Sequence, residues 1–462
     1  MMRELPAAAV AAVVAVVGVG LGATGCSNDD VGPCSLRTNF GCSADLQCET
    51  VQGRDLPTCL PPVVVRGHVY DLSTHLTVSG ARVLVLGDDG APLTAASSSA
   101  TDGSYAVRLH APRDAAFKPQ ALRLSPWVQA PGYGQFPDRW RPAPVLDAAN
   151  AQLTAGGTEL DLATADTEVG LLPFGGGPGI SEVAGLVAIP DPARQVLVVA
   201  SSQDSFGGPL GIAGLADATG SYRLFGLVPA HYTVSAYASG SSFLPVPIAV
   251  SAGEQATINV PADPTAASTV TGRLQVAGGG RPSVALFVAA TYNADSGEGD
   301  VPLGLSATAA ADGSFSIAGV SPGSYVVVPS PDNDGLALIG APPTIVVVAG
   351  HDLVVPGSIA VGPAVPITGP GAGGPEAVTT APTLSWSHLA DEASYHLTVT
   401  SGVGLVVWDM PAVPATASPS VAYSGPFEPG AFYRFRVQAL DAHGAPVAAS
   451  EDLRGIFFRP GP

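Results

Sequence analysis

Charge is scarce in this chain of 462 residues, and basic charge is scarcest. Charged residues make up 12% of the sequence, about half of the roughly 25% found in ordinary globular domains. Lys118 is the single lysine, and the formal net charge is -19. A chain this acidic lacks the general basic surface that contacts with a phosphate backbone require. We therefore expect no nucleic-acid partner.

The composition also disfavours long helices. The sequence contains 56 glycines and 44 prolines, and both residue types interrupt helices. Hydrophobic residues still reach 46%, whereas a disordered chain is poor in them. From residue 63 onward, Val-rich alternating runs are separated by Gly, Pro, Asp and Asn, as in strands that are joined by turns. These features predict an all-β fold.

The N-terminus has the features of an export signal. Residues 7–21 are almost wholly apolar, follow Arg3 and lead into small residues, which is the layout of a secretory signal peptide. Residues 21–26, Leu-Gly-Ala-Thr-Gly-Cys, resemble the bacterial lipoprotein signal, in which the new N-terminal cysteine carries diacylglycerol. This resemblance implies lipid attachment at Cys26. The alternative is ordinary secretory cleavage, because Ala23 and Gly25 also fit a small-x-small site.

Cysteine is absent after residue 59. Besides Cys26, the cysteines are Cys34, Cys42, Cys48 and Cys59. Lipidation of Cys26 leaves this even number, whereas ordinary secretion leaves an odd thiol, so the count favours the lipoprotein. We expect two disulfides in an oxidising compartment, and the spacing leaves all three pairings open. A zinc site is the weaker alternative, because no Cys-x-x-Cys pair is present and the nearest histidine is His68.

The residues that follow Cys26 suggest a tether. Residues 27–30, Ser-Asn-Asp-Asp, are polar, and Ser27 resembles the residue that permits sorting to the outer membrane in Gram-negative lipoproteins. We therefore expect an exported protein that is lipid-anchored to the bacterial cell envelope, at the outer membrane, and that faces the periplasm or the cell surface. The membrane is then its first partner.

Three units of the body share an opening glycine and a later turn that leads into an aromatic residue. Each turn contains Asp-Gly or Thr-Gly, which supplies the positive φ that a tight hairpin needs. The separations are 38, 37 and 43 residues, in the pairs Gly67 and Tyr105, Gly185 and Tyr222, and Gly272 and Phe315. Units two and three continue with matching segments, residues 226–232 and 319–325, and each segment leads into a further strand.

These elements resemble the carboxypeptidase regulatory-like module, whose pattern combines Gly-x-Val, Gly-Ala-x-Val, Asp-x-x-Gly-x-Tyr and Pro-Gly-x-Tyr. The resemblance covers roughly residues 63–362 and implies three transthyretin-like β-sandwiches. Unit two has Ala230 where the pattern has Gly, and unit one lacks the Pro-Gly-x-Tyr element and carries an insertion over residues 111–147.

The pattern changes after the Gly- and Pro-rich residues 368–375. Residues 384–386 (Leu-Ser-Trp), 395–399 and 427–439 resemble a fibronectin type III domain. The resemblance implies that Trp386 is the buried strand tryptophan. It also implies that Tyr433 is the tyrosine corner, which ties a loop back to the sandwich.

We expect these segments to follow one another in a row. They are a lipoprotein signal peptide (1–25), a Cys-rich disulfide stem (26–62), three carboxypeptidase regulatory-like modules (63–172, 173–267 and 268–365) and a fibronectin type III-like domain (366–462). The Gly-rich residues 175–179 and 369–374 are interpreted as linkers, because no helix-forming segment follows either one.

Residue patterns of common enzymes are missing. The modules resemble a part of a carboxypeptidase, but none of the eight histidines is followed three residues later by the Glu that the zinc enzyme requires. Gly-x-Ser-x-Gly, His-Glu-x-x-His and a P-loop are also absent from the sequence. We expect no catalytic residue, no metal and no cofactor. The acidic loop with Asp295, Glu298 and Asp300 leaves loose calcium binding open beside the simpler alternative of a solvated hairpin.

One segment is unusually aromatic. Trp127, Tyr133, Phe136 and Trp140 lie close together with Arg139 and Arg141. Flat rings beside arginine are typical of surfaces that stack on a sugar or anchor a protein partner. The alternative is that the rings fill a junction between modules, because aromatic residues are commonly buried.

Together these features predict a non-enzymatic envelope lipoprotein that acts as an extended structural or adhesive scaffold. Its partners would be envelope or extracellular proteins. The alternative is a carbohydrate-binding surface protein that contacts glycans through the segment from Trp127 to Trp140. An enzyme with an unrecognised site on a β-sandwich is the third hypothesis.

Overall fold

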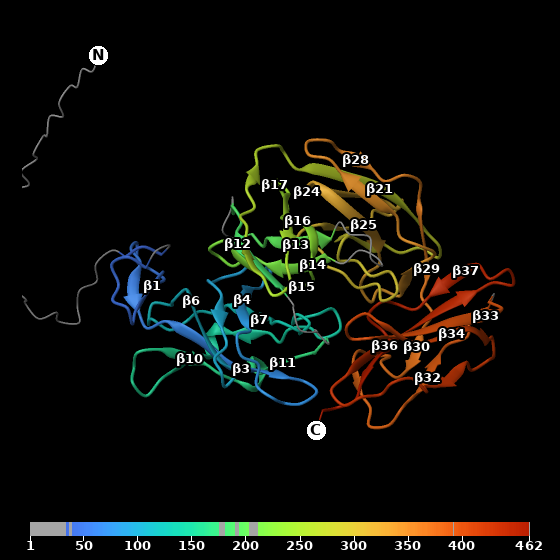
Figure 1. Ribbon diagram of the computed structural model, residues 1–462, viewed down its shortest axis with the longest axis horizontal. Coiled ribbons are helices and arrows are strands. Elements are labelled where there is room, and N and C mark those ends of the chain that lie inside the picture. The colour runs from blue at the N-terminus through green and yellow to red at the C-terminus, as the bar shows by residue number, and fades with distance from the viewer. Residues whose placement is uncertain are drawn as a thin grey trace, which may run out of the picture.

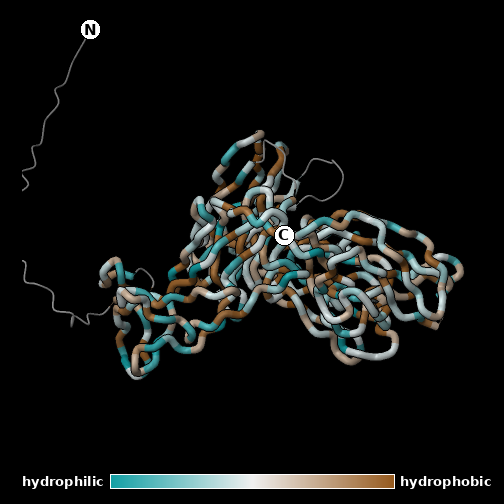
Figure 2. Tube along the Cα trace, turned by 90° about the horizontal axis from the view of Figure 1, so that it is seen from below, coloured by the Kyte–Doolittle hydropathy of each residue, from teal (hydrophilic) through white to brown (hydrophobic). Residues whose placement is uncertain are grey.

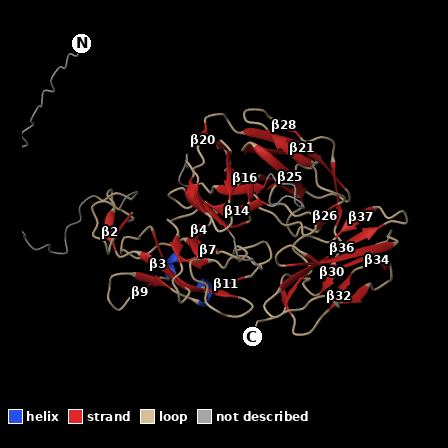
Figure 3. Cartoon of the chain, in the orientation of Figure 1, coloured by secondary structure: helices blue, strands red, loops and turns tan. Residues whose placement is uncertain are grey.

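The computed structural model describes residues 34–36, 39–174, 181–189, 194–202, 211–390 and 392–461. Strands and loops account for nearly all of them (Figure 3), beside two short 3-10 helices, Ala148–Asn150 and Ala165–Thr167. The predicted all-β fold is therefore confirmed. Within these ranges no helix has the length and apolar character needed to cross a bilayer. The predicted signal peptide, the lipidation at Cys26 and the linker at residues 175–179 lie outside the described residues.

The N-terminal stem is one antiparallel hairpin, formed by β1 (Gln47–Glu49) and β2 (Thr58–Leu60). Cys48 and Cys59 are directly opposite each other in this hairpin. The stem lies at one end of the molecule, beside the first sandwich (Figure 1).

The first sandwich contains nine strands: β3 (Val63–Asp71), β4 (Arg82–Gly87), β5 (Ser97–Ser98), β6 (Ser104–Leu109), β7 (Arg123–Gln129), β8 (Leu146–Asp147), β9 (Gln152–Leu153), β10 (Leu160–Leu162) and β11 (Val169–Leu171). One sheet has the order β11-β3-β10-β9, and β6 also pairs with β3. The other sheet has the order β5-β4-β7-β8.

The second sandwich is built in the same way from β12 (Ser181–Leu186), β13 (Leu197–Ser202), β14 (Gly211–Leu215), β15 (Ser221–Leu227), β16 (Ala230–Tyr237), β17 (Ser242–Phe243), β18 (Val246–Val250), β19 (Gln255–Thr257) and β20 (Ala262–Asp263). Its two main sheets have the orders β15-β12-β19 and β14-β13-β16-β18, and β17 pairs with β20.

The third sandwich repeats this arrangement with β21 (Ser268–Val276), β22 (Ser283–Val288), β23 (Ser306–Thr308), β24 (Ser314–Val320), β25 (Gly323–Pro329), β26 (Leu336–Leu338), β27 (Thr344–Val347), β28 (Leu353–Val354) and β29 (Ile359–Pro363). One sheet has the order β24-β21-β29-β26, and β28 also pairs with β21. The other has the order β23-β22-β25-β27.

The fourth sandwich is formed by β30 (Ile367–Gly369), β31 (Glu376–Ala377), β32 (Thr383–Trp386), β33 (Ser394–Ser401), β34 (Val406–Pro414), β35 (Ser420–Ala422), β36 (Phe432–Leu440), β37 (Pro446–Ala449) and β38 (Ile456–Phe458). Its sheets have the orders β30-β32-β35 and β31-β38-β36-β33-β34, and β37 pairs with β36. Trp386 is 2% exposed in the core of this sandwich. Tyr433 accepts a hydrogen bond from the Glu428 backbone N–H at 3.0 Å.

The glycine and aromatic residues that define the three repeats are cross-strand partners. Gly67 lies opposite Tyr105, Gly185 opposite Tyr222, and Gly272 opposite Phe315. In the first two sandwiches the tyrosine hydroxyl donates across the glycine to a carbonyl of the neighbouring parallel segment, that of Thr167 or Ile258, at 2.7 Å in both cases. In the third, a Cβ on the glycine would lie 2.4 Å from the phenylalanine ring. Each glycine therefore leaves the space that its partner and the next backbone need.

The four sandwiches pack against one another, and this corrects the expected row. The fourth sandwich lies beside the first (Figure 1), where Arg141 approaches the Phe432 ring to 5.6 Å and Leu72 O would be 2.3 Å from a Cβ on Gly430. The chain thus closes on itself from the first sandwich to the fourth.

This closure buries the central strand of one sheet in each of the first three sandwiches on both faces. All six residues of β4 are buried, whereas a sheet with one solvated face would alternate. Leu84 and Trp127 of the first sandwich and Leu197 of the second belong to the same hydrophobic cluster as the third sandwich's core. Figure 2 shows hydrophobic and hydrophilic residues interleaved along all parts of the body.

Arginine joins the first two sandwiches. The Arg82 side chain, 6% exposed, donates to Leu215 O at 2.8 Å and to Ser221 O at 2.7 Å. Burial lowers the pKa of Arg82 to about 10, and the Asp217 carboxylate opposes this effect. The guanidinium therefore stays charged at neutral pH and fixes the two sandwiches relative to each other.

Replacing Gly185 by Ala tests the repeated glycine. A Cβ there would lie 1.7 Å from Ile258 O, so the strand or its neighbour must move, and we expect a loss of about 2–4 kcal/mol of stability. Gly373→Ala is the matched control, because no atom lies within 4 Å of its Cβ position. Thermal unfolding of both variants measures the difference. Equal melting temperatures for the two variants would contradict the assignment.

Candidate functional site

The four predicted aromatic site residues do not share one surface. Trp127 lies on β7, is 4% exposed and packs in the cluster between the first three sandwiches. Tyr133 and Phe136 are partly buried against the core of the first sandwich. Trp140 is 4% exposed and faces the third and fourth sandwiches. Rings placed in this way offer no common platform for a sugar, so the carbohydrate-binding alternative is not supported.

Residues 130–145, between β7 and β8, form what we call the junction loop. Three side chains of this loop reach the third sandwich. The Trp140 indole donates to Glu298 Oε1 at 2.7 Å, Arg139 Nη1 donates to Gly297 O at 3.0 Å, and Gln135 Nε2 donates to Asp300 Oδ1 at 3.2 Å. The guanidinium of Arg139 also donates to Pro331 O. The insertion in unit one is therefore a connector between sandwiches.

The fourth sandwich completes this contact through Arg434 on β36. Its side chain is 1% exposed, and Nη1 lies 2.8 Å from Asp452 O and 3.7 Å from Glu298 Oε1. The guanidinium carbon lies 5.9 Å from the Trp140 ring centre. Side chains from three sandwiches thus meet at Glu298, and we call Trp140, Glu298 and Arg434 the junction triad.

Burial shapes the electrostatics of the junction. It raises the pKa of the Glu298 and Asp300 carboxyls, although Arg139 and Arg434 stabilise the charge on Glu298 and Gln135 stabilises that on Asp300. Burial also lowers the pKa of Arg434. These opposing charges compensate one another only while the three sandwiches stay together, because a buried charge without a partner is costly.

The acidic loop is part of this junction. Glu298 and Asp300 accept hydrogen bonds from the junction loop, while Asp295 is exposed to solvent. Across the described ranges, the one group of His, Cys, Asp or Glu atoms close enough to share a metal ion is Cys34, Cys42 and Cys59. The two half-buried carboxylates therefore serve as hydrogen-bond acceptors between sandwiches.

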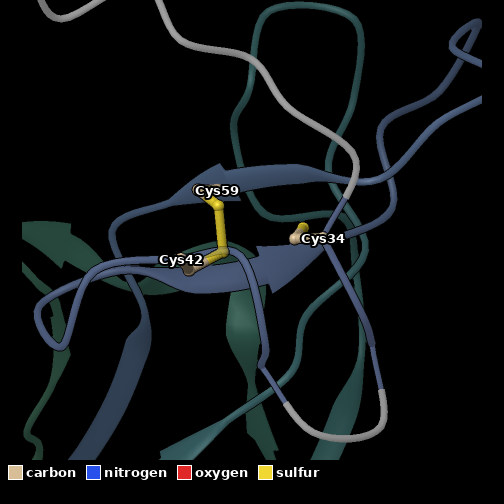
Figure 4. Close-up of side chains that lie close together, drawn as sticks. All are labelled: Cys34, Cys42 and Cys59. Carbon is tan, nitrogen blue, oxygen red and sulfur yellow. A yellow bond between two sulfur atoms is a disulfide. The ribbon is translucent and has the colours of Figure 1, made fainter. Parts of the chain in front are cut away.

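The stem contains two disulfides, Cys34–Cys48 and Cys42–Cys59. The expected disulfides are thus confirmed, and the structure selects one of the three pairings. Figure 4 shows the Cys42–Cys59 bond with Cys34 close to it. Sulfur atoms bonded in this way are not thiolates, and zinc requires thiolate ligands.

The stem is packed against the first sandwich by a buried ion pair. Glu49, 1% exposed, lies 3.7 Å from the guanidinium of Arg113, which is 0% exposed. Glu49 Oε2 also accepts from the Ala111 backbone N–H at 3.0 Å, and Arg113 Nη2 donates to Pro61 O at 2.7 Å. Burial raises the pKa of Glu49 to about 7, against the opposing effects of Arg113 and the Ala111 N–H. The stem is therefore a packed extension of the body.

The sequence identifies some residues of the junction, but it does not indicate which residues they contact. Trp140 and Glu298 were both singled out, but nothing in their spacing links them to each other or to Arg434. Glu49 and Arg113 were not singled out, because each lies in an ordinary polar context. Continuous apolar runs such as Val83 to Leu86 on β4 were the available signal for contacts between sandwiches.

Replacing Trp140 by Phe tests the junction triad. The change keeps an aromatic ring but removes the N–H that donates to Glu298. We therefore expect the free energy that holds the sandwiches together at the junction to fall by about 1–2 kcal/mol. Backbone hydrogen exchange in β36 should become faster. Trp127→Phe is the matched control, because it trims a buried tryptophan that is not bonded to Glu298. Equally fast exchange of β36 in both variants would contradict a specific role for the triad.

Glu49 should give the stem a pH dependence. Its folded pKa of about 7 exceeds the ordinary value of 4.5, so between these values the folded state binds more protons than the unfolded state. Stability from this group is therefore full below about pH 4.5 and falls as the pH rises towards 7. We expect Glu49→Gln to remove about 1–3 kcal/mol of this decline, measured by unfolding at about pH 5 and about pH 8. Asp55→Asn, at an exposed position in the same stem, should leave the decline unchanged. An unaltered decline in Glu49→Gln would refute the assignment.

Comparisons with known proteins give no family. No protein-family model matches the chain, and no curated protein matches it. Among solved structures the chain is similar to the Streptococcal ancillary pilin, at 10% identity and a TM-score of 0.17, over 65% of this chain and 98% of that chain. BcpA, the major pilin subunit of Bacillus cereus, is 11% identical with a TM-score of 0.17, over 66% of this chain and 100% of that chain. The Bacillus anthracis TIE protein is 9% identical with a TM-score of 0.16, over 87% of this chain and 74% of that chain. TM-scores this low carry no argument about function.

Proposed function

We propose that this chain is a non-enzymatic scaffold protein of the bacterial cell envelope, tethered through a lipid on Cys26. The observation that carries the proposal is the stem. It contains two disulfides, which belong to an oxidising compartment, and it follows directly on the residues that resemble a lipoprotein signal. The buried pair of Glu49 and Arg113 then joins the stem to the body.

A structural role fits the use of the buried polar groups. Arg82, Arg139 and Arg434 donate to backbone carbonyls of other strands or sandwiches, and Glu298 accepts from Trp140. These groups hold sandwiches together, and their side chains are buried or half-buried. The surface left for partners is the outside of the assembled body, so we propose protein partners in the envelope or outside the cell.

The family assignments of the sandwiches belong to this proposal. The shared pairing of Gly67, Gly185 and Gly272 with their aromatic partners supports three related carboxypeptidase regulatory-like modules. Trp386 and Tyr433, which lie where a fibronectin type III domain would place them, support the assignment of the fourth. We keep the expected boundaries at residues 172, 267 and 365, and we propose the outer membrane as the site of anchoring.

Replacing Cys26 by Ala tests the anchor. Without the thiol no lipid can be attached, so the protein should move from the membrane fraction to the soluble fraction and lose labelling by a radioactive fatty acid. Ser27→Ala is the matched control, because it keeps the thiol and should remain labelled and membrane-bound. A wild-type protein that is extracted without detergent and carries no label would refute the proposal.

A further inference from the structure

An open cleft of about 730 Å³ lies on the third sandwich, outside the junction and the stem. Its lining includes Thr271 and Arg273 of β21, Ser314 and Ser316 of β24, Val354 of β28, and Arg281. A neighbouring cleft of about 570 Å³ shares Arg273 and Arg281. The two guanidinium groups therefore lie between two clefts, whose linings also include serine and threonine hydroxyl groups.

Neither arginine forms an ion pair within 4 Å in the described part of the chain, although Arg273 and the Asp312 carboxylate attract each other over a longer distance. Some other exposed arginines do contact carboxylates, as Arg123 contacts Asp88 and Arg223 contacts Glu182. No carboxylate of the described residues lies within 4 Å of Arg273 or Arg281; Arg281 Nε donates to Ala309 O at 3.2 Å.

The acid that lines the second cleft is already engaged. Asp312 Oδ1 accepts from the Ser314 backbone N–H at 3.0 Å and from the Ser314 hydroxyl at 2.7 Å. These bonds hold the carboxylate in its own hairpin turn. In a protein of net charge -19, this place thus presents two cations beside a single carboxylate, which is bonded within its own turn.

Comparison of the repeats gives an independent observation. The residue after the opening glycine is His68 in the first sandwich, and its ring nitrogen lies 3.1 Å from Glu168. The same position in the third sandwich is Arg273. Glu168 follows Thr167, the residue beside Gly67, and Pro356 correspondingly follows Val355, the residue beside Gly272. The third sandwich therefore has an arginine where the first has a histidine, and a proline where the first has the acid that contacts this histidine.

The chemistry of the lining indicates the ligand. Guanidinium groups bind carboxylates through paired, charge-assisted hydrogen bonds, and Val354, 72% exposed, offers an apolar contact beside them. Phe315, the aromatic residue of the lining, is 5% exposed, so no ring is open for stacking on a sugar. β24 ends the strand order of its sheet, and the backbone of an edge strand can pair with an extended peptide.

We propose that this cleft binds an acidic, extended peptide segment of a protein partner, with Arg273 and Arg281 holding its carboxylates. The proposal rests on the proposed function, because it names the chemistry of the protein partner that a scaffold would bind. It assigns the outer surface of β21 and β24 as the interface.

The test uses the full chain carrying Cys26→Ala, so that failure of the lipid anchor in cells does not affect the result. The probe is a fluorescent peptide of alternating Glu and Val, and its binding is followed by anisotropy. We expect saturable binding that Arg273→Gln with Arg281→Gln weakens about tenfold. Pro356→Glu, which restores the acid that the first sandwich has, should weaken binding as well. Arg273, Arg281 and Pro356 are exposed, and thermal unfolding verifies that the variants fold.

Two controls decide whether the cleft is specific. Arg54→Gln with Arg123→Gln removes the same charge from exposed positions elsewhere and should leave binding unchanged; an equal loss would show that overall charge alone attracts the peptide. A galacturonate oligosaccharide with the same number of carboxylates should bind weakly. Binding of this oligosaccharide as tight as that of the peptide, or no binding of the peptide to the unaltered cleft, would overturn the proposal.

Discussion

The hydrogen bond from Trp140 to Glu298 helps to orient the first, third and fourth sandwiches relative to one another. It brings a loop of the first sandwich onto the third, and Arg434 of the fourth covers both. Each of these groups is costly to bury alone, because a carboxylate or a guanidinium loses its hydration. Their mutual compensation is available only in the closed arrangement, so the polar junction specifies how the apolar sheet faces meet.

The scarcity of lysine has a structural counterpart in the way arginine is used. Arg82, Arg139 and Arg434 are directed at backbone carbonyls rather than at solvent. A planar guanidinium can serve several acceptors at fixed angles, which the ammonium of lysine cannot do equally well. Between sandwiches of similar shape, such fixed angles distinguish one packing arrangement from others that bury a similar apolar area.

Local features of the fold could be predicted from the sequence, and contacts over long distances could not. The spacing from Gly67 to Tyr105 reflects a cross-strand pair, and the position of Tyr433 relative to Glu428 reflects a turn within one loop. These relations are set within one hairpin or one sheet. Trp140 and Glu298 come into contact only when the sandwiches pack against one another. No periodicity in the sequence indicates that packing. The disulfide pairing belongs to the same class, since spacing alone allowed three solutions.

The packing of the fourth sandwich on the first alters how the body would carry mechanical load. If the four sandwiches were arranged in a row, a force applied to the last one would pass through every linker in turn. Here Leu72 and Gly430 are in contact, so tension applied to the fourth sandwich reaches the sandwich that bears the stem without crossing the second and third.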